Sequence, residues 1–247
     1  MLNKNQVFLH TYPEQTLTSQ QNQVYNQLVA RRVKGEPVAY LIGKRDFYDL
    51  TFKVTPAVLI PRPETELLVE LALARVPVDR HCRVLDLGTG SGAVAITIAK
   101  HRPRTTVVAV DVSVDAIVVA SKNAKEIGVT NVTIINGDWF DAMIGVKFDL
   151  IVSNPPYVAE EDPHLKQGDL RFEPLLALAA EDDGLASLRW ISSEAPKHLN
   201  TGGWLLMEHG YDQADVCRKL LKEAGFNRIF SSPDLAGIMR VSGGEML

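Results

Sequence analysis

Short apolar runs alternate with helical segments from residue 82 onward, and this alternation is the strongest constraint on the fold of the chain. The strand-like runs are residues 83–87, 107–110, 132–135, 149–152 and 204–207. The helix-like runs between them are residues 93–100, 114–127, 185–199 and 212–224. Such alternation is typical of parallel strands that are covered on both faces. The sequence therefore predicts an α/β fold with a doubly wound, mostly parallel sheet, ending in two strands at residues 228–231 and 237–241 that are joined by a turn.

The residues before this domain show a mainly helical pattern. Thr18 or Ser19 can cap a helix over residues 17–33, whose apolar residues recur at helical spacing. Three prolines between residues 56 and 63 are typical of a stiff connector. Pro63 is suited to the first turn of a bridging helix that runs to about Arg75.

A short hairpin is expected between these two helices. Residues 45–48 and 51–54 have strand character on either side of Asp49 and Leu50. The sequence thus divides into a small, mainly helical N-terminal region with a hairpin, a linker with the bridging helix, and the α/β domain, which span residues 1–55, 56–80 and 81–247.

A glycine-rich turn follows the first predicted strand and consists of Gly88, Thr89, Gly90, Ser91 and Gly92. Glycines permit positive φ and close backbone approach, and the N-terminus of the following helix offers unpaired N–H groups to an electron-rich ligand. Asp111 ends the next strand, where it can accept both hydroxyls of a ribose. Open α/β sheets bind ligands at this edge. A dinucleotide and an adenosyl cofactor fit this pattern equally well.

The fourth predicted strand runs into Asn154, Pro155, Pro156 and Tyr157. Two consecutive prolines remove two backbone donors and hold the chain extended. Their carbonyls and the Asn154 side-chain oxygen are left as acceptors beside an aromatic ring, which suits a planar group that carries NH2.

The third predicted strand ends at the same edge with Asp138 and Trp139, where an adenine ring would meet a polar group and a flat apolar wall. For Trp139, a packing role and a ligand contact stay equally open.

These motifs together resemble the Rossmann-like, S-adenosylmethionine-dependent methyltransferases that methylate a planar nitrogen. The resemblance implies S-adenosyl-L-methionine as the methyl donor and S-adenosyl-L-homocysteine as the product. It also implies catalytic residues Asn154, Pro155 and Tyr157, an acceptor held by these three and Pro156, and cofactor contacts from Gly88, Thr89, Gly90, Ser91, Gly92, Asp111, Trp139 and Asn154.

The chemistry of an amide explains why such a pocket needs acceptors. An amide nitrogen is a weak nucleophile because its lone pair is delocalised into the carbonyl. The Asn154 side chain and the Pro155 carbonyl can hold both N–H bonds and favour the charge that grows on nitrogen. Tyr157 would stack on the flat group and set the in-line geometry. The proton leaves after transfer, so no general base is required, and Glu208 and His209 receive no catalytic role.

Longer stretches resemble one family within this group, the bacterial N5-glutamine methyltransferases that modify class-I peptide chain release factors. These stretches are GEPVAYLIG (35–43), VTPAVLIPRPETE (54–66), DLGTGSG (86–92), GDWF (137–140), VSNPPY (152–157), QGDLRFEP (167–174) and MEHG (207–210). The resemblance implies that the glutamine of the Gly-Gly-Gln loop in release factors 1 and 2 is the acceptor, in support of translation termination. Residues 1–55 would then dock the release factor. Members of the family usually carry a longer helical region before Gly35, so we expect either a start farther upstream or a trimmed domain.

Charge bears on the alternative acceptors, which are adenine or guanine in nucleic acid and another protein glutamine. The net charge is −4, from 26 Lys and Arg against 30 Asp and Glu, which argues against a stable nucleic-acid partner. Residues 158–184, which leave the pocket, hold eight acids against Lys166 and Arg171. A polyphosphate would meet a like-charged wall there, whereas a basic protein loop would be attracted. Residues 31–62 are basic and form a second candidate docking face. A non-catalytic cofactor-binding module is the remaining alternative.

Other features of the sequence argue against disulfide-bonded, metal-binding and membrane-spanning proteins. Cys82 and Cys217 lie in unrelated segments, which favours two reduced, buried thiols in a cytoplasmic protein. The six histidines show no metal-ligand spacing, so no metal is expected. The N-terminus lacks a signal pattern, and no apolar run reaches membrane-spanning length. Glu64 and Glu66 could either cap the bridging helix or cover the cofactor.

Overall fold

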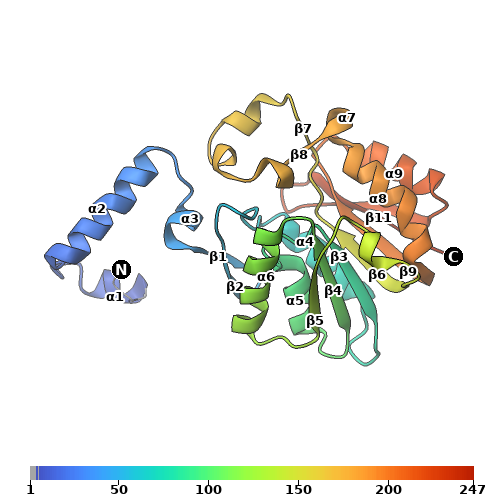
Figure 1. Ribbon diagram of the computed structural model, residues 1–247, viewed down its shortest axis with the longest axis horizontal. Coiled ribbons are helices and arrows are strands. Elements are labelled where there is room, and N and C mark those ends of the chain that lie inside the picture. Colours follow the sequence, from blue (N-terminus) through green and yellow to red (C-terminus); the bar gives the residue numbers. More distant parts are fainter. Residues whose placement is uncertain (1–3, 5) are drawn as a thin grey trace.

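The computed structural model describes residue 4 and residues 6–247. Its main body is one sheet with helices on both faces, and the first two helices lie apart from it (Figure 1). The strands of the central sheet are β3 (Arg83–Leu87), β4 (Thr106–Asp111), β5 (Val132–Asn136), β6 (Phe148–Ser153), β9 (Leu199–Glu208), β10 (Asn227–Pro233) and β11 (Met239–Glu245). The helices around it are α4 (Thr65–Arg75), α5 (Ala93–His101), α6 (Val114–Ile127), α8 (Ala186–Glu194) and α9 (Ala214–Glu223).

The order of the central sheet is β10-β11-β9-β6-β3-β4-β5. The five strands from β9 to β5 are parallel, while β11 pairs antiparallel with β9 and with β10. This confirms the expected doubly wound, mostly parallel sheet. It brings the carboxyl ends of β3, β4, β5, β6 and β9 to one edge of the molecule.

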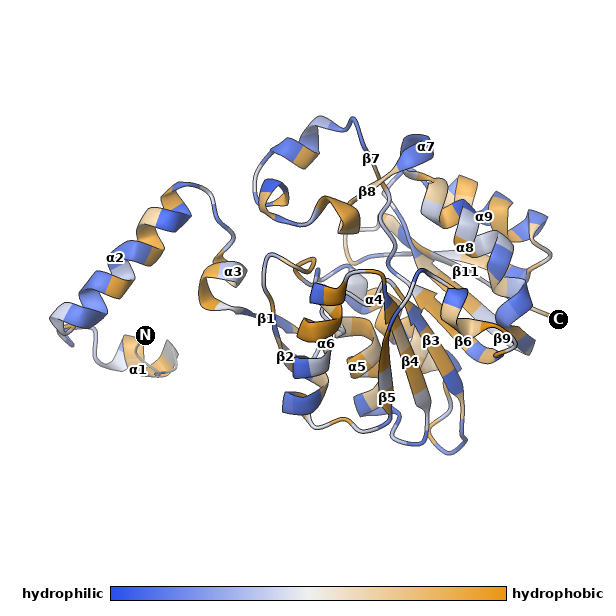
Figure 2. Ribbon diagram, viewed as in Figure 1, coloured by the Kyte–Doolittle hydropathy of each residue, from blue (hydrophilic) through white to orange (hydrophobic). Residues whose placement is uncertain are grey.

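Two apolar layers hold the sheet between its helices. Val84 and Leu150 pack with α4 and α5 on one face, whereas Leu85 and Ile151 pack with α8 and α9 on the other. Successive residues of a strand point to opposite faces, so a strand covered on both sides must be apolar throughout. Figure 2 shows the resulting apolar band through the sheet and the inner faces of the helices.

Two helices begin or end at other residues than their sequence pattern predicted. The helix expected over residues 185–199 stops at Glu194 and continues as a 3-10 turn over Ala195–His198. Pro196 has no N–H with which to continue the α-helical hydrogen bonds, which explains this end. Helix α4 begins at Thr65, two residues after Pro63.

The N-terminal region contains more helix than its sequence pattern indicated. Helix α2 (Ser19–Val33) is the expected one, and Thr18 caps it in a reciprocal pair of hydrogen bonds with Gln21. Two short helices were not predicted, α1 (Gln6–Thr11) and α3 (Val38–Ile42). No residue of α2 is buried, and its apolar side chains Val24, Tyr25, Val29 and Val33 are exposed.

The expected hairpin is present as β1 (Lys44–Phe47) and β2 (Leu50–Lys53), but its turn is one residue earlier than predicted. Tyr48 and Asp49 form the turn, and Tyr48 has a φ of 58°. Phe47 and Phe52 are buried in the core of the main domain. The hairpin therefore packs against the main body.

Residues 158–180 form a surface segment above the carboxyl edge, here called the flap (Figure 1). Its two-residue strands β7 (Val158–Ala159) and β8 (Ala179–Ala180) pair in parallel, and the short helix α7 (Glu181–Gly184) follows. Three 3-10 turns lie between β7 and β8, at Pro163–Lys166, Leu170–Phe172 and Leu175–Ala177. Within residue 4 and residues 6–247, no helix has the length and apolar character needed to cross a membrane.

Candidate active site

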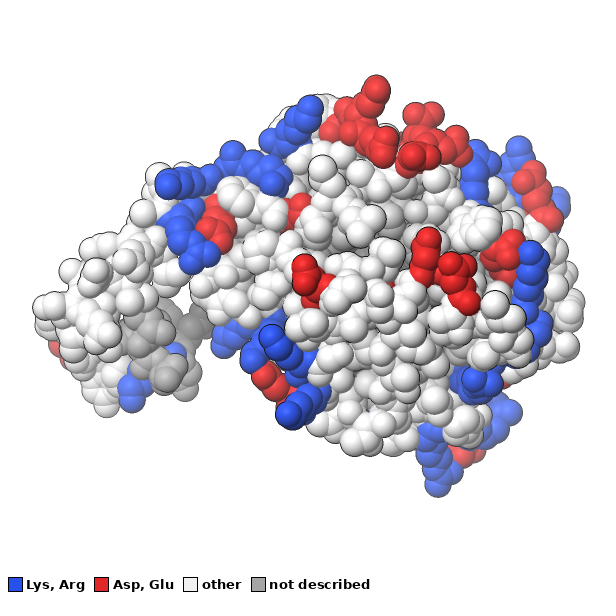
Figure 3. All heavy atoms as spheres, in the orientation of Figure 1, with Lys and Arg blue, Asp and Glu red and all other residues white. Residues whose placement is uncertain are grey.

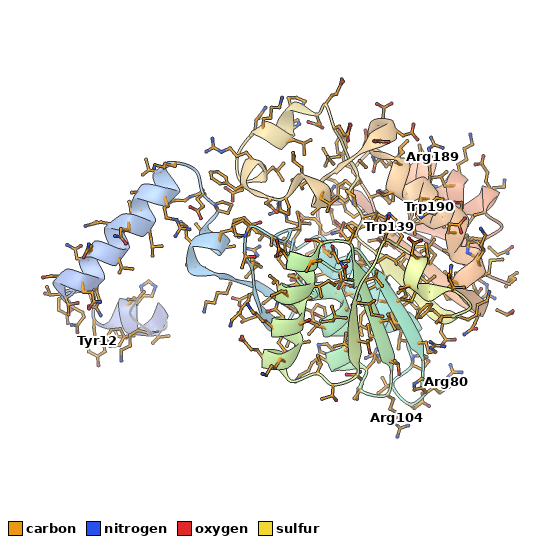
Figure 4. All side chains as sticks on the ribbon, viewed as in Figure 1. Tyr12, Arg80, Arg104, Trp139, Arg189 and Trp190 are labelled. Atoms are coloured by element: carbon orange, nitrogen blue, oxygen red, sulfur yellow. The ribbon has the colours of Figure 1, made fainter. Side chains whose placement is uncertain are left out.

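A cavity of about 370 Å³ lies at the carboxyl edge of the sheet, between the glycine-rich turn and the flap. Figure 4 shows Trp139 at this edge. Of the sites predicted from sequence, its lining contains Gly88, Thr89, Gly90, Ser91, Asp111, Trp139, Asn154 and Pro156. Gly92, Pro155 and Tyr157 lie just outside the lining. The structure thus brings the glycine-rich turn, the acid that ends β4, and Asn154 and Pro156 after β6 to one hollow.

The glycine-rich turn is held open by bonds to β4. The Gly88 and Thr89 N–H groups both donate to the Val110 carbonyl at 2.9 Å. Gly88 and Gly90 have φ values of 72° and 55°, which a residue with a Cβ rarely adopts. Gly92 precedes α5 with a φ of 82° and has a packing role, because a Cβ there would lie 2.6 Å from Ile96 Cδ1.

Asp111 organises the turn as well as facing the cavity. Its Oδ2 accepts from the Gly90 N–H at 2.8 Å, and its Oδ1 accepts from the Ser113 N–H at 2.9 Å. Burial raises the pKa of Asp111, while these two N–H groups act in the opposite direction. Each carboxylate oxygen has a second lone pair that can still accept a ribose hydroxyl.

A second acid, Asp86, supports the turn from beneath. It is 1% exposed and accepts from the Thr89 hydroxyl at 2.7 Å. Burial raises the pKa of Asp86 to about 7, against the opposing effect of the Thr89 hydroxyl. The cavity wall therefore combines two acids with a polarised backbone.

The orientation of the Asn154 amide is set by Thr65, the first residue of α4. The Asn154 Nδ2 donates to the Thr65 Oγ1 at 3.1 Å. Because nitrogen and oxygen of an amide point in different directions, Asn154 Oδ1 is turned away from Thr65 and left as an acceptor. Both residues line the cavity.

Tyr157 is held by hydrogen bonds at its side-chain hydroxyl and at its backbone carbonyl. Its hydroxyl donates to Glu208 Oε1 at 3.2 Å, and its carbonyl accepts from Gln213 Nε2 at 3.0 Å. Burial raises the pKa of Tyr157, so the hydroxyl stays protonated and acts as a donor. Gly184 has a φ of +82°, and a Cβ there would lie 2.3 Å from the Tyr157 carbonyl oxygen. Neither hydrogen bond of Tyr157 was predicted from the sequence.

Glu208 is a fully enclosed acid at the end of β9. It is 1% exposed, and its Oε2 has no hydrogen-bond partner among the described residues. Burial raises the pKa of Glu208 to about 7, the Thr65 and Tyr157 hydroxyls and Arg240 oppose this, and Glu64 adds to it. One signal for it is in the sequence, because an acid directly after an apolar run falls at the binding edge of the sheet.

The next residue, His209, takes part in a different network behind the sheet. Its Nδ1 is 2.8 Å from the Gly210 carbonyl, and its Nε2 is 2.8 Å from Ser242 Oγ. Burial lowers the pKa of His209. The neutral ring then donates from Nδ1 and accepts from Ser242, which is a structural arrangement.

The flap is attached to the linker by a buried ion pair. Arg62 pairs with Glu173, whose side chain is 0% exposed, and Glu173 Oε2 also accepts from the Ile60 N–H at 3.0 Å. A buried carboxylate needs partners of this kind to remain charged. Arg62 lines the cavity, so this ion pair closes one of its sides.

Glu64 and Glu66 both lie outside the cavity lining. Glu64 stands at the N-cap position of α4 without a side-chain hydrogen bond to the helix. Glu66 Oε1 accepts from the Tyr48 N–H at 2.8 Å and thereby ties α4 to the hairpin turn.

Neither of the two cysteines lines the cavity. Cys217 is buried, and burial raises its pKa to about 12, whereas Cys82 is only partly buried. The expectation of two buried thiols is therefore wrong for Cys82. Across the part of the chain that the structure describes, no group of three or more His, Cys, Asp or Glu residues is arranged to hold a metal ion.

Comparison with known proteins identifies the family. Residues 63–169 match the family described as Methyltransferase small domain, and residues 1–43 match the PrmC N-terminal domain. The release factor glutamine methyltransferase of Salmonella typhimurium is 46% identical over 98% of this chain and 87% of its own length. The Bordetella pertussis protein of the same name is 49% identical over 100% of this chain and 91% of its own length. The chain belongs to the release factor glutamine methyltransferase family.

Solved structures agree on the fold of this family member. A methyltransferase from Pyrococcus furiosus has a TM-score of 0.59 at 18% identity and covers 87% of this chain and 95% of its own. The T. thermophilus 16S rRNA N2 G1207 methyltransferase, solved with AdoMet and guanosine, has a TM-score of 0.62 at 20% identity, over 83% of this chain and 50% of its own. At such identities the likeness concerns the fold alone. The predicted Rossmann-like class I methyltransferase fold is confirmed.

Proposed function

We propose that the chain transfers a methyl group from S-adenosyl-L-methionine to the side-chain amide nitrogen of the glutamine in the Gly-Gly-Gln loop of class-I release factors 1 and 2, in the cytoplasm. Its membership of the release factor glutamine methyltransferase family supports this reaction. The observation that carries the proposal is the hydrogen bond from Asn154 Nδ2 to Thr65 Oγ1, which turns Asn154 Oδ1 toward an incoming N–H group.

The residues present fit an adenosyl cofactor. Gly88 and Gly90 have open backbone beside the cavity, since a Cβ on Gly88 would meet no atom closer than 3.9 Å and one on Gly90 none within 4 Å. Asp111 would hold the ribose, and Trp139 with neighbouring apolar side chains would cover a purine. When bound, S-adenosylmethionine supplies an electrophilic methyl group on a sulfonium.

The residues that follow β6 would hold the acceptor. Asn154 Oδ1 and the Pro155 carbonyl would each accept one N–H of the glutamine amide and stabilise the positive charge that grows on its nitrogen. Tyr157, anchored to Glu208 and Gln213, would fix the plane of the amide. The excess proton can leave to water after the transfer.

The surface around the cavity supports a protein acceptor over a nucleic acid. The exposed acids Glu160, Glu161, Glu181, Asp182 and Asp183 lie on the flap and α7, where Figure 3 shows acidic groups along the upper edge. Leu175 and Leu176 are 61% and 62% exposed, and Leu176 lines the cavity. An acidic rim with apolar side chains is suited to a basic protein loop and repels a polyphosphate.

We further propose that the N-terminal region docks the release factor. Helix α2 projects from the main body (Figure 1) and leaves Val24, Tyr25, Val29 and Val33 exposed. An apolar helix face that the described residues leave exposed suits a contact with another protein.

Label transfer would test the function. The protein is incubated with methyl-labelled S-adenosylmethionine and, separately, release factor, ribosomal protein, tRNA or DNA. We expect label in release factor alone, and none in a release factor whose loop glutamine is replaced by alanine. Label in nucleic acid, or label that persists without that glutamine, would refute the proposal.

A variant would test the pocket. Asn154→Ala should abolish the transfer while the affinity for S-adenosylmethionine, measured by calorimetry, falls only modestly. Transfer by this variant at close to the wild-type rate would contradict the role of Asn154.

A further inference from the structure

Glu208 is a costly residue for the fold to keep. It ends β9 after the apolar residues Leu205, Leu206 and Met207, and all four are at most 1% exposed. A buried carboxylate with one oxygen left without a partner destabilises a protein, and a neutral residue of the same shape would pack as well. Packing alone therefore does not account for an acid at this position.

The groups around Glu208 belong to the acceptor pocket. The Tyr157 hydroxyl donates to its Oε1 at 3.2 Å, and the Thr65 hydroxyl lies where it favours the charged form. Two other charged groups act on Glu208, namely Arg240 on β11 and Glu64 before α4. Glu208 thus accepts a hydrogen bond from Tyr157, and its pKa is lowered by Thr65, the residue that binds the Asn154 amide.

The hydrogen bonds between these groups have a direction. Thr65 Oγ1 accepts from Asn154 Nδ2, so the hydroxyl proton of Thr65 must point to another acceptor. The Thr65 hydroxyl favours the charged form of Glu208, and we assign its proton to this carboxylate, whose Oε1 already accepts from the Tyr157 hydroxyl. In this network the donors would run from Asn154 to Thr65 to Glu208, which would hold Asn154 Oδ1 toward the substrate position.

Protonation of Glu208 would remove the acceptor that sets the direction of these hydrogen bonds. A neutral carboxyl group is itself a donor, so the Thr65 hydroxyl could instead donate to the Asn154 side-chain oxygen. The amide would then turn over and present N–H groups to the N–H groups of the substrate. The acceptor pocket needs the charged form, which burial and Glu64 oppose while Thr65, Tyr157 and Arg240 support it.

We propose that Glu208 is a positioning residue, which acts through the hydroxyls of Thr65 and Tyr157 to hold the Asn154 amide and the tyrosine ring in the orientation that accepts a glutamine N–H. This inference rests on the proposed function of Asn154 and Tyr157 as acceptor-binding groups. Glu208 itself contacts neither the cavity nor the substrate position.

Three variants test the inference in kinetics with release factor as acceptor. Glu208→Gln removes the charge, Thr65→Val removes the relay at the same volume, and Thr65→Ser restores the hydroxyl. The first two should lower kcat by a factor on the order of 10 to 100, as expected for a misplaced reactive group. Thr65→Ser should stay within about threefold of wild type, and the affinity for S-adenosylmethionine should be unchanged in all three.

The pH profile separates positioning from a merely structural role. The wild-type kcat should rise from pH 6 to pH 8, because the pKa of Glu208 is raised to about 7. The Glu208→Gln profile should lack this rise. Ser242→Ala is the matched control, since it removes a buried hydrogen bond of His209 on the neighbouring strand and should leave the rise intact. A Glu208→Gln enzyme that keeps both kcat and the rise would overturn the inference.

A spectroscopic readout keeps the test independent of activity. The side-chain NH2 resonances of Asn154 should titrate in wild type with a midpoint near the pKa of Glu208, about 7, and should not titrate in Glu208→Gln. An unchanged titration in Glu208→Gln, or none in wild type, would refute the network. If Glu208→Gln does not fold, loss of the titration in Thr65→Val carries the same test. A wild-type protein that shows the titration but does not label release factor would refute the proposed function and leave the network standing.

Discussion

Replacing Glu208 by glutamine should make the protein more stable at pH 8, although it slows the reaction. The two side chains have nearly the same shape, so the substitution changes charge and little else. Burial raises the pKa of Glu208 from 4.5 to about 7. The folded protein therefore binds a proton at this site more readily than the unfolded chain does.

The sign and size of this stability difference follow from proton linkage. The pKa of Glu208 is higher in the folded protein than in the unfolded chain. Its contribution to the free energy of unfolding is therefore complete below pH 4.5 and is lost as the pH rises through about 7. A shift of this size corresponds to about 3 kcal/mol, lost by pH 8. Glutamine does not ionise, and it still accepts one hydrogen bond through Oε1. Weakening of the bonds from Thr65 and Tyr157 reduces the gain, so we expect Glu208→Gln to raise the free energy of unfolding by roughly 1 to 3 kcal/mol at pH 8.

Urea denaturation of wild type and variant at pH 5 and pH 8 measures this difference. Asp86, whose pKa burial raises to about 7, also titrates in this range, but it is present in both proteins and cancels in the comparison. Glu223→Gln is the control, because Glu223 is 61% exposed and its substitution should produce no pH-dependent difference. A Glu208→Gln protein that is less stable than wild type at pH 8, or a difference that is the same at both pH values, would refute the reasoning.

Three further variants probe other parts of the site. Asp111→Ala removes the acceptor of the Gly90 N–H and should weaken S-adenosylmethionine binding about 10- to 100-fold by calorimetry; an unchanged affinity would place the ribose elsewhere. Gly184→Ala puts a Cβ 2.3 Å from the Tyr157 carbonyl, so it should lower kcat and cost about 1 to 3 kcal/mol in urea denaturation, and a wild-type kcat would contradict the anchoring role. Val29→Glu, at a position 40% exposed on α2, should raise the KM for release factor on the order of tenfold without changing cofactor affinity, whereas an equal KM would argue against docking there.

The strands and their order in the chain were predictable because each one leaves a local mark. A strand covered on both faces must be apolar along its length, and β3 and β6 show this directly. The glycine-rich turn is equally local, because Gly88 and Gly90 occupy conformations that other residues rarely adopt. The turn of the hairpin was misplaced by one residue because its position depends on Glu66, which accepts from Tyr48 across 18 residues.

The sequence by itself determined the α/β fold, and it predicted the edge of the sheet and the two residues, Asn154 and Pro155, that we propose bind the acceptor. Only the tertiary structure decided which polar groups support them. Thr65 is 89 residues from Asn154, and Glu208 is 51 residues from Tyr157, so no spacing in the chain relates them. Whether an acid at the end of a strand is solvated or enclosed depends on what packs over it. Here α4 and the chain after β6 meet over β9, and their packing converts Glu208 into a buried charge behind the pocket.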